Sequence, residues 1–207
     1  MSRYTGPKMR KVRRHGEAFA MAADRSTAAK FVKSHHKQPP GMHGATRIFK
    51  KHTGYGLQLQ EKQKAKIFYH INEKQLRKYY AEAVREVGST DNNLLRLLES
   101  RLDNVIYRAG FTASHPQARQ LIVHKQFQLN GKVVSIPSIQ VKSGDVITCV
   151  SKQKLHDIIA SLAANNSPVS WLKVDPTQLK IRVTELPTRE EIEAPFTEQL
   201  IIEFYSR

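Results

Sequence analysis

The feature that most restricts the fold is the apolar pattern of residues 91–109. Seven apolar side chains recur there at helical spacing and form one face: Leu94, Leu95, Leu98, Leu102, Val105, Ile106 and Ala109. Asp91 can cap the start of this segment, and Gly110 can end it. Since an amphipathic helix must bury its apolar stripe, the pattern predicts one helix over 91–109 in the core of a packed domain.

The residues that follow predict a second helix and a small sheet. Ser114 is a favourable N-cap, and Pro116 is allowed in the first helical turn. The letters FQLNGK, residues 127–132, read as a strand that enters a hairpin. Asn130-Gly131 is the strongest two-residue hairpin signal, because both residues tolerate a positive φ. With a further strand over 146–150, the segment predicts two helices packed on a small antiparallel sheet.

The chain before residue 91 predicts two more helices and a basic arm. Residues 57–71 and 73–87 carry apolar side chains at helical spacing. Residues 1–56 contain many turn formers and few apolar side chains. We therefore expect an irregular arm, with one short helix around 18–32, that gains order from a partner.

The chain after residue 150 completes the prediction of an α+β protein. Residues 151–165 predict a helix and residues 170–186 a hairpin. The tail over 196–207 is too apolar to remain in water, so it must dock on another element. The expected divisions are 1–90 for the arm and helical domain, 91–185 for the two helices, sheet, helix and hairpin, and 186–207 for the docking tail.

Charge gives the first indication of a partner. The chain has 34 Lys and Arg against 18 Asp and Glu, a formal net charge of +16. Residues 1–90 hold 20 of these cations and 6 of the acids, so the excess is concentrated there. A polyanion is the expected partner, with nucleic acid first and an anionic membrane surface second.

Acidic residues are also missing in two blocks, 25–60 and 104–144. A carboxylate that faced a phosphate would be repelled at close range, so we expect two surfaces cleared of negative charge. On the second, cations and the start of a helix could hold phosphates: Arg101, Arg108, Ser114, His115 and Arg119. Two short helices that meet in this way also resemble a DNA-reading helix-turn-helix, but the adjoining sheet favours RNA.

Signatures of catalysis and metal binding are absent from the sequence. The patterns GxxxxGK[ST], GxGxxG, HExxH and GxSxG do not occur. Histidines without cysteines at CxxC spacing do not predict a structural zinc site, so we expect no metal and no cofactor. Cys149, the only cysteine, is interpreted as a small buried hydrophobe. No run approaches the ~18 apolar residues of a membrane span, and the basic N-terminus lacks the apolar core of a secretory signal.

Several stretches resemble one known family. The segments LLRLLESRLDNVIYRAGF, ARQLI, LNGK and VKSGDVI are similar to the small RNA-binding domain named after ribosomal protein S-four. The segments SRYTGPKMRKVRRHG, PPGMHG, YGLQLQEKQKAKIFYHINEKQLRKYY, WLKVD and LIIEFYSR match the usual pattern of that ribosomal protein itself. The resemblance to the ribosomal protein S-four family, bacterial type, thus spans nearly the whole chain in order.

The resemblance implies a structural protein of the small ribosomal subunit and not an enzyme. Such a protein binds small-subunit rRNA at a helix junction of the 5′ domain and nucleates assembly of the subunit body. It contacts the neighbouring small-subunit protein five, helps line the mRNA entrance, and has no membrane partner. Its small RNA-binding domain is inserted into the helical one. The implied location is the ribosome, in the cytoplasm of a bacterium or in an organelle.

The resemblance also implies which residues bind. The rRNA-binding set is Arg3, Lys8, Arg13, Arg14, Arg47, Lys62, Lys64, Arg77, Lys78, Arg101, Arg108, Ser114, His115, Gln117 and Arg119. Those at the mRNA entrance are Arg47, Lys50 and Lys51. Three departures stand out: the four zinc-binding cysteines of many relatives are missing from the arm, His115 replaces the usual Arg, and Gln60 replaces another.

Two functions of other classes remain open at this point. An RNA-modifying enzyme, such as a pseudouridine synthase, can carry the same small domain as a targeting module. It would need a catalytic domain with a buried Asp, for which no segment is long enough. A DNA-binding regulator would prefer duplex DNA to a folded RNA junction in a salt-titrated competition.

Overall fold

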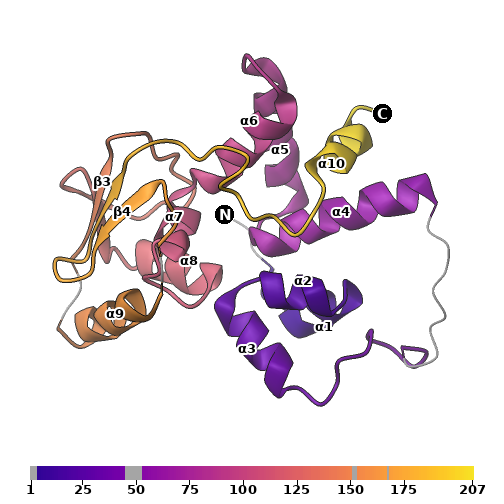
Figure 1. The fold of residues 1–207 in the computed structure, drawn as a ribbon, viewed down its shortest axis with the longest axis horizontal. Helices are drawn as coiled ribbons and strands as arrows, with labels where there is room; N and C mark the ends of the chain where they lie inside the picture. Colours follow the sequence, from indigo (N-terminus) through magenta and orange to yellow (C-terminus); the bar gives the residue numbers. More distant parts are fainter. Residues whose placement is uncertain (1–3, 45–52, 151–152, 167) are drawn as a thin grey trace. The chain divides into compact units, whose positions relative to one another are not determined.

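The computed structural model describes residues 4–44, 53–150, 153–166 and 168–207 (Figure 1). The chain divides into two compact units, which we call unit 1 and unit 2. Unit 1 combines Met1–Leu94 with Glu193–Arg207, and unit 2 is Leu95–Ile192. Unit 2 is therefore inserted in the sequence of unit 1.

Unit 1 is helical, including most of the described arm. Its helices are α1 (Lys8–Arg14), α2 (Glu17–Ala22), α3 (Arg25–Lys33), α4 (Gly54–Phe68), α5 (Glu73–Arg85) and α10 (Glu198–Tyr205), and α6 (Thr90–Glu99) begins in it. The expectation of an arm with one short helix around 18–32 is wrong, because three helices occupy residues 8–33. Buried Val12, Phe19 and Phe31 give each of them an apolar anchor. Asp24 separates α2 from α3 and caps α3 by accepting a hydrogen bond from the Thr27 N–H at 2.9 Å.

The C-terminal tail forms α10, which packs against α4 and α5 (Figure 1). Ile201 is fully buried at this contact, and the Phe196 ring lies 6.0 Å from that of Phe68. The apolar face expected for residues 73–87 is partly wrong, because Val84 is 54 % exposed and Val87 is 99 % exposed. Helix α5 ends at Arg85, so Val87 lies beyond the helical repeat that suggested its burial.

Unit 2 is built from helices and one antiparallel sheet. Its elements are α7 (Leu102–Arg108), α8 (His115–Val123), β1 (Phe127–Leu129), β2 (Lys132–Val134), β3 (Val146–Cys149), α9 (Gln153–Asn165), β4 (Leu172–Asp175) and β5 (Lys180–Val183). The strand order is β2-β1-β3-β5-β4, and every neighbouring pair is antiparallel. Asn130 and Gly131 have φ of 50° and 78°, which confirms the predicted hairpin turn.

The predicted single helix over 91–109 is two helices. Arg101 has an extended backbone, with φ −65° and ψ 137°, between α6 and α7. There the chain pairs with the segment 137–141: the Leu102 N–H donates to the Ile139 carbonyl at 2.9 Å, and the Val141 N–H donates to the Ser100 carbonyl at 2.8 Å. Long-range backbone pairing thus replaces one helical turn without disturbing the apolar spacing on either side.

The core of unit 2 lies on one face of the sheet. Phe127 of β1, Ile147 of β3 and Ile181 of β5 are fully buried with the apolar faces of α7 and α8 and with Ile159 of α9. Together with the helical unit 1, this arrangement confirms the predicted α+β class. None of the helices in the described ranges is long and apolar enough to cross a membrane.

Candidate nucleic-acid interface

Helix α1 presents several of the predicted cations. Val12 is buried and fixes the inner side of the helix. Arg14 is exposed, and Lys8 and Arg13 are half-buried. The Arg13 Nε donates to the Gln38 carbonyl at 2.8 Å, which ties the segment after α3 to α1. The helix contains no acid, so three cations of the predicted set share seven residues of entirely uncharged or basic character.

Positive charge is crowded between α1 and α4. The Lys11 ammonium lies 3.2 Å from the centroid of the Tyr4 ring, and burial together with the charge of Lys66 lowers the pKa of Lys11. Burial, and after it the charge of Lys64, lowers the pKa of His15 to about 4. Since Lys64 and Lys66 are paired with Glu61 and Glu73, Lys11 is the cation of this group that a bound anion would neutralise.

Lys62 and Lys64 on α4 are held by acids of unit 1. The Lys62 side chain is only 7 % exposed; its Nζ lies 3.0 Å from Glu73 Oε1 and 4.0 Å from the Phe204 ring centroid. The Lys64 Nζ lies 2.7 Å from Glu61 Oε1. Lys62 belongs to the set expected to bind phosphates, but the structure places its ammonium inside, between α4, α5 and α10. Its position suits a role in docking α10.

Glu73 is the centre of that docking site. It lies 2.9 Å from the Lys66 Nζ and accepts a hydrogen bond of 2.7 Å from the Tyr205 hydroxyl. Burial by itself raises the pKa of Glu73, but hydrogen bonds from Lys66, Tyr205 and Lys62 outweigh it and hold the pKa at about 2. Burial and the same carboxylate raise the pKa of Tyr205. At neutral pH, Glu73 is therefore the counter-ion of cations on α4.

Helix α5 turns its basic side outward. Arg77 and Lys78 are exposed, as is Lys74 one turn earlier. Leu76, Tyr79 and Ala83 hold the opposite side in the core of unit 1. Because the three cations lie within five residues, they offer a compact basic surface that a phosphate backbone can approach.

Arg101 occupies an unexpected position in unit 2. Its side chain is 1 % exposed, and the guanidinium binds the Asp103 carboxylate at two points, Nη2 to Oδ2 at 2.6 Å and Nε to Oδ1 at 3.0 Å. Placing Arg101 on an exposed face of the 91–109 helix was wrong. The extended backbone between α6 and α7 rotates this residue away from the helical repeat and into the interior.

Arg108 and His115 belong to one hydrogen-bonded network around Glu99. The Arg108 guanidinium binds Glu99 at 2.7 and 3.1 Å, and the Asn104 amide nitrogen donates to the same carboxylate. The Asn104 carbonyl oxygen lies 2.9 Å from His115 Nε2, and the His115 ring lies 4.1 Å from that of Tyr107. Since the amide nitrogen of Asn104 is used on Glu99, His115 Nε2 is the donor to Asn104. Through this network, residues of α7 hold His115, the first residue of α8, in place.

The remaining predicted residues of unit 2 surround the start of α8. Ser114 holds the N-cap position, but its side chain makes no capping hydrogen bond. Gln117 Oε1 accepts from the Ala113 N–H at 2.9 Å and so closes the loop before the helix. Arg119 is buried on the same helix. The positive end of the α8 dipole thus lies beside the half-buried Ser114.

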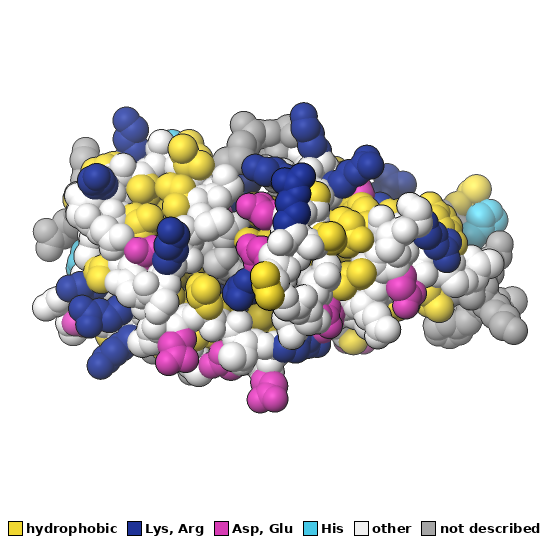
Figure 2. Space-filling view, turned by 90° about the horizontal axis from the view of Figure 1, so that it is seen from above, with side chains coloured by type: hydrophobic (Ala, Val, Ile, Leu, Met, Phe, Trp, Pro, Cys, Tyr) yellow, Lys and Arg dark blue, Asp and Glu magenta, His cyan; other side chains and the backbone are white. Residues whose placement is uncertain are grey.

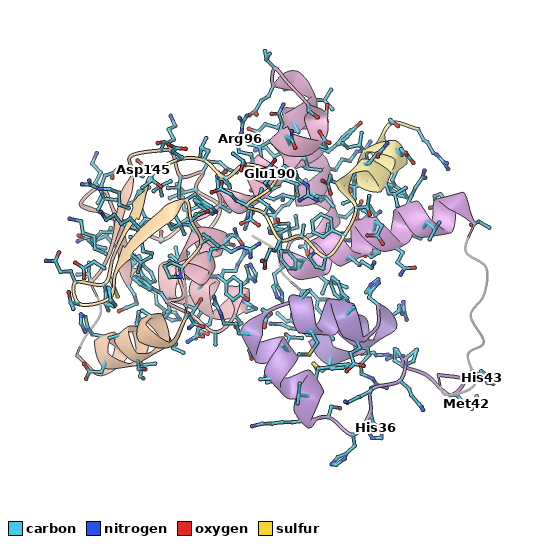
Figure 3. All side chains as sticks on the ribbon, in the orientation of Figure 1. His36, Met42, His43, Arg96, Asp145 and Glu190 are labelled. Atoms are coloured by element: carbon cyan, nitrogen blue, oxygen red, sulfur yellow. The ribbon has the colours of Figure 1, made fainter. Side chains whose placement is uncertain are left out.

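Four predicted residues lie outside the described parts of the chain: Arg3, Arg47, Lys50 and Lys51. Between them, the segment after α3 is described, and its His36, Met42 and His43 side chains point away from the helices of unit 1 (Figure 3). These predictions at the mRNA entrance and at the N-terminus stay predictions.

Some exposed cations were not in the predicted set. Lys74 on α5, Lys173 on β4 and Arg182 on β5 are exposed. Figure 2 shows Lys and Arg side chains at many points of the drawn surface, separated by uncharged groups and some acids. Alternation could have identified Lys173 and Arg182. In the strand letters LKVD and KIRV, each of these two cations stands between apolar residues that are buried or half-buried.

Comparison with known proteins gives full-length matches. Residues 3–99 match the model of the ribosomal protein S4/S9 N-terminal domain, and residues 100–147 match the S4 domain. The chain is 47 % identical over 210 residues to the small ribosomal subunit protein uS4 of Heliobacterium modesticaldum, with 100 % of both chains covered. It is 47 % identical over 208 residues to the protein of the same name from Rubrobacter xylanophilus, again with 100 % of both covered.

Proposed function

Because the chain belongs to the family of small ribosomal subunit protein uS4, we propose that it is a structural component of the small subunit that works by binding rRNA. The full-length likeness supports a ribosomal location and a non-catalytic role. We further propose that it binds a helix junction of the 5′ domain, nucleates assembly of the subunit body, contacts small-subunit protein five and helps line the mRNA entrance.

The observation that carries the proposal is the basic surface that each of two helices of unit 1, α1 and α5, turns outward. Arg14 on α1 and Arg77 and Lys78 on α5 are exposed. Cations on such a surface can neutralise the phosphates along an extended nucleic acid, and the release of counterions then drives binding. Glu61 of α4 and Glu73 of α5 take part in docking α10. Both are already paired with lysines, so they do not neutralise the positive charge of this surface.

We assign two roles within the predicted rRNA-binding set. Residues that would contact RNA directly are Lys8, Arg13, Arg14, Arg77, Lys78, Ser114 and Gln117, with Arg3 and Arg47 outside the described ranges. Residues that would hold the binding surfaces in place are Lys62, Lys64, Arg101, Arg108, His115 and Arg119. The burial and ion pairs of Lys62, Arg101 and Arg108 support this division.

Chemical footprinting of small-subunit rRNA with and without the full chain tests the proposal. We expect protection confined to one junction of RNA helices, together with an affinity that falls steeply with salt. A duplex DNA of equal length serves as the competitor. Protection scattered over the whole RNA, or equal competition by the DNA, would remove the basis for the assignment.

A further inference from the structure

The two faces of the unit 2 sheet differ in character. The strand register places the buried residues on one face and the following side chains on the other: Gln128, Val133, Val146, Thr148, Lys173, Asp175, Lys180 and Arg182. We call this second set the outward face. In Figure 1, α7 and α8 lie to one side of the strands, which agrees with the burial of the first set. The outward face is therefore the solvent side of unit 2.

Three cations occupy the β4–β5 half of the outward face. Lys173 lies directly opposite Arg182 in the ladder, and Lys180 stands two residues before Arg182 on the same strand. Directly opposed side chains have Cβ atoms ~4.5–5.5 Å apart, and like charges in such a pair destabilise the sheet. Within the described chain, Lys173 and Arg182 form no ion pair that would offset this repulsion. A bound anion would offset the repulsion between these two side chains.

The one acid of the outward face does not neutralise this pair. Asp175 lies opposite Lys180, and its carboxylate accepts hydrogen bonds from the turn that follows β4, from the Thr177 N–H at 3.0 Å and the Gln178 N–H at 3.2 Å. It is thus engaged in closing the β4–β5 hairpin. Arg182 faces Val146 on its other side, so no acid lies directly opposite it, and Asp175 is its diagonal neighbour.

The chemistry of the outward face fits a phosphate backbone. A guanidinium, two ammonium groups, the Gln128 amide and the Thr148 hydroxyl can all donate hydrogen bonds to phosphate oxygens. Unpaired bases are read chiefly by stacking on aromatic rings, and the outward face contains no aromatic residue. Recognition would therefore be of charge and shape and not of base sequence.

We propose that Lys173, Lys180 and Arg182 form a further contact with the rRNA backbone, separate from the start of α8. This inference rests on the proposed function. It predicts that unit 2 binds RNA through the sheet as well as through its helices. An acidic protein surface could also match three cations, and binding to such a partner in place of rRNA would contradict the proposal.

Salt-titrated binding to a transcript of small-subunit rRNA tests this contact. The test variant is the full chain with K173Q, K180Q and R182Q together, and the matched control carries K173R, K180R and R182K, which keep all three charges. We expect the test variant to lower the slope of log K against log salt by about two to three units, on the order of one per lost contact. The control should keep the wild-type slope, and footprints of the test variant should lose one patch of protection only.

Folding is checked by thermal unfolding of both variants. Removing the opposed like charges should leave the melting temperature of the test variant unchanged or raise it. A test variant that is folded and binds the transcript with the wild-type slope would overturn the inference, as would loss of binding to another ribosomal protein with rRNA binding intact. Failure of the wild-type chain to bind the transcript would instead overturn the proposed function.

Discussion

Replacement of Arg101 by alanine tests whether this residue maintains the fold of unit 2 or contacts RNA. The guanidinium and the Asp103 carboxylate are 1 % and 6 % exposed and share bonds of 2.6 and 3.0 Å. Removing one partner of such a pair leaves a buried, uncompensated charge, which typically costs ~3–5 kcal/mol. Since a domain is stable by only ~5–15 kcal/mol, R101A should lose a large share of the free energy of unfolding of unit 2.

The measurement uses Trp171, the only tryptophan of the chain, which is buried in the core of unit 2. Its fluorescence in a urea titration reports the unfolding of unit 2, and the shift in midpoint gives the loss of stability. The control is R101M with D103N, which removes both charges and keeps an oxygen for the Asn104 N–H that Asp103 binds at 3.0 Å. Because replacing both members of a buried pair is often neutral, this double variant should recover most of the lost stability.

The reasoning would be refuted by a specific pattern. If R101A unfolds within about 0.5 kcal/mol of the wild type, the buried pair does not stabilise unit 2. If the same variant also binds small-subunit rRNA with a salt slope reduced by about one unit, Arg101 is a phosphate ligand in the complex. The family-based prediction of direct contact would then be right and the division of roles proposed above wrong.

Three further predictions concern unit 1. The double variant R77Q/K78Q should lower the salt slope of rRNA binding by about two units, without a shift in melting temperature, as filter binding and calorimetry would reveal. Glu73 has a pKa of about 2, below its usual 4.5, so its contribution to stability is complete above pH 4.5 and disappears as the pH falls toward 2. The stability of E73Q should therefore depend less on pH in this window than that of the wild type, and parallel curves of stability against pH for the two proteins would contradict the docking role. His15 has a pKa lowered to about 4, so NMR of its ring should show a titration midpoint near 4. Its contribution to stability should diminish as the pH falls from 6.5 to 4, and a midpoint near 6.5 would show that desolvation and Lys64 do not lower its pKa.

The sequence predicted the elements of unit 2 well because local signals and tertiary structure agree there. The Asn130-Gly131 turn needs two positive φ angles, and few other residue pairs supply them. The break between α6 and α7 has no such signal. It depends on backbone bonds from Leu102 and Val141 to partners about 40 residues away in the sequence, and the apolar spacing continues through it. Long-range pairing of this kind cannot be deduced from periodicity.

The arm was underestimated for a related reason. Its Gly and Pro residues suggested turns, but the helices are short and fit between them. Asp24 illustrates the point, since it ends one helix and caps the next. Its buried carboxylate also lies 3.0 Å from His70 Nε2 at the end of α4, a contact between residues 46 apart. The apolar anchors of α1 to α3 number about one per helix, too few to be recognised without knowledge of what they pack against.

The acids, more than the cations, determine which basic residues can reach RNA. The block without acids from 25 to 60 ends at Glu61, which binds the Lys64 ammonium and accepts the Thr197 N–H at 3.0 Å. The block from 104 to 144 begins after Asp103, the partner of Arg101. The buried acids Glu61, Glu99 and Asp103 each neutralise a nearby cation and fix its position. The cations that remain available to phosphates are those without a buried acid beside them. By this criterion the cations of α5 and of the outward face of the sheet are better candidates for RNA contact than Arg101, which the resemblance had favoured.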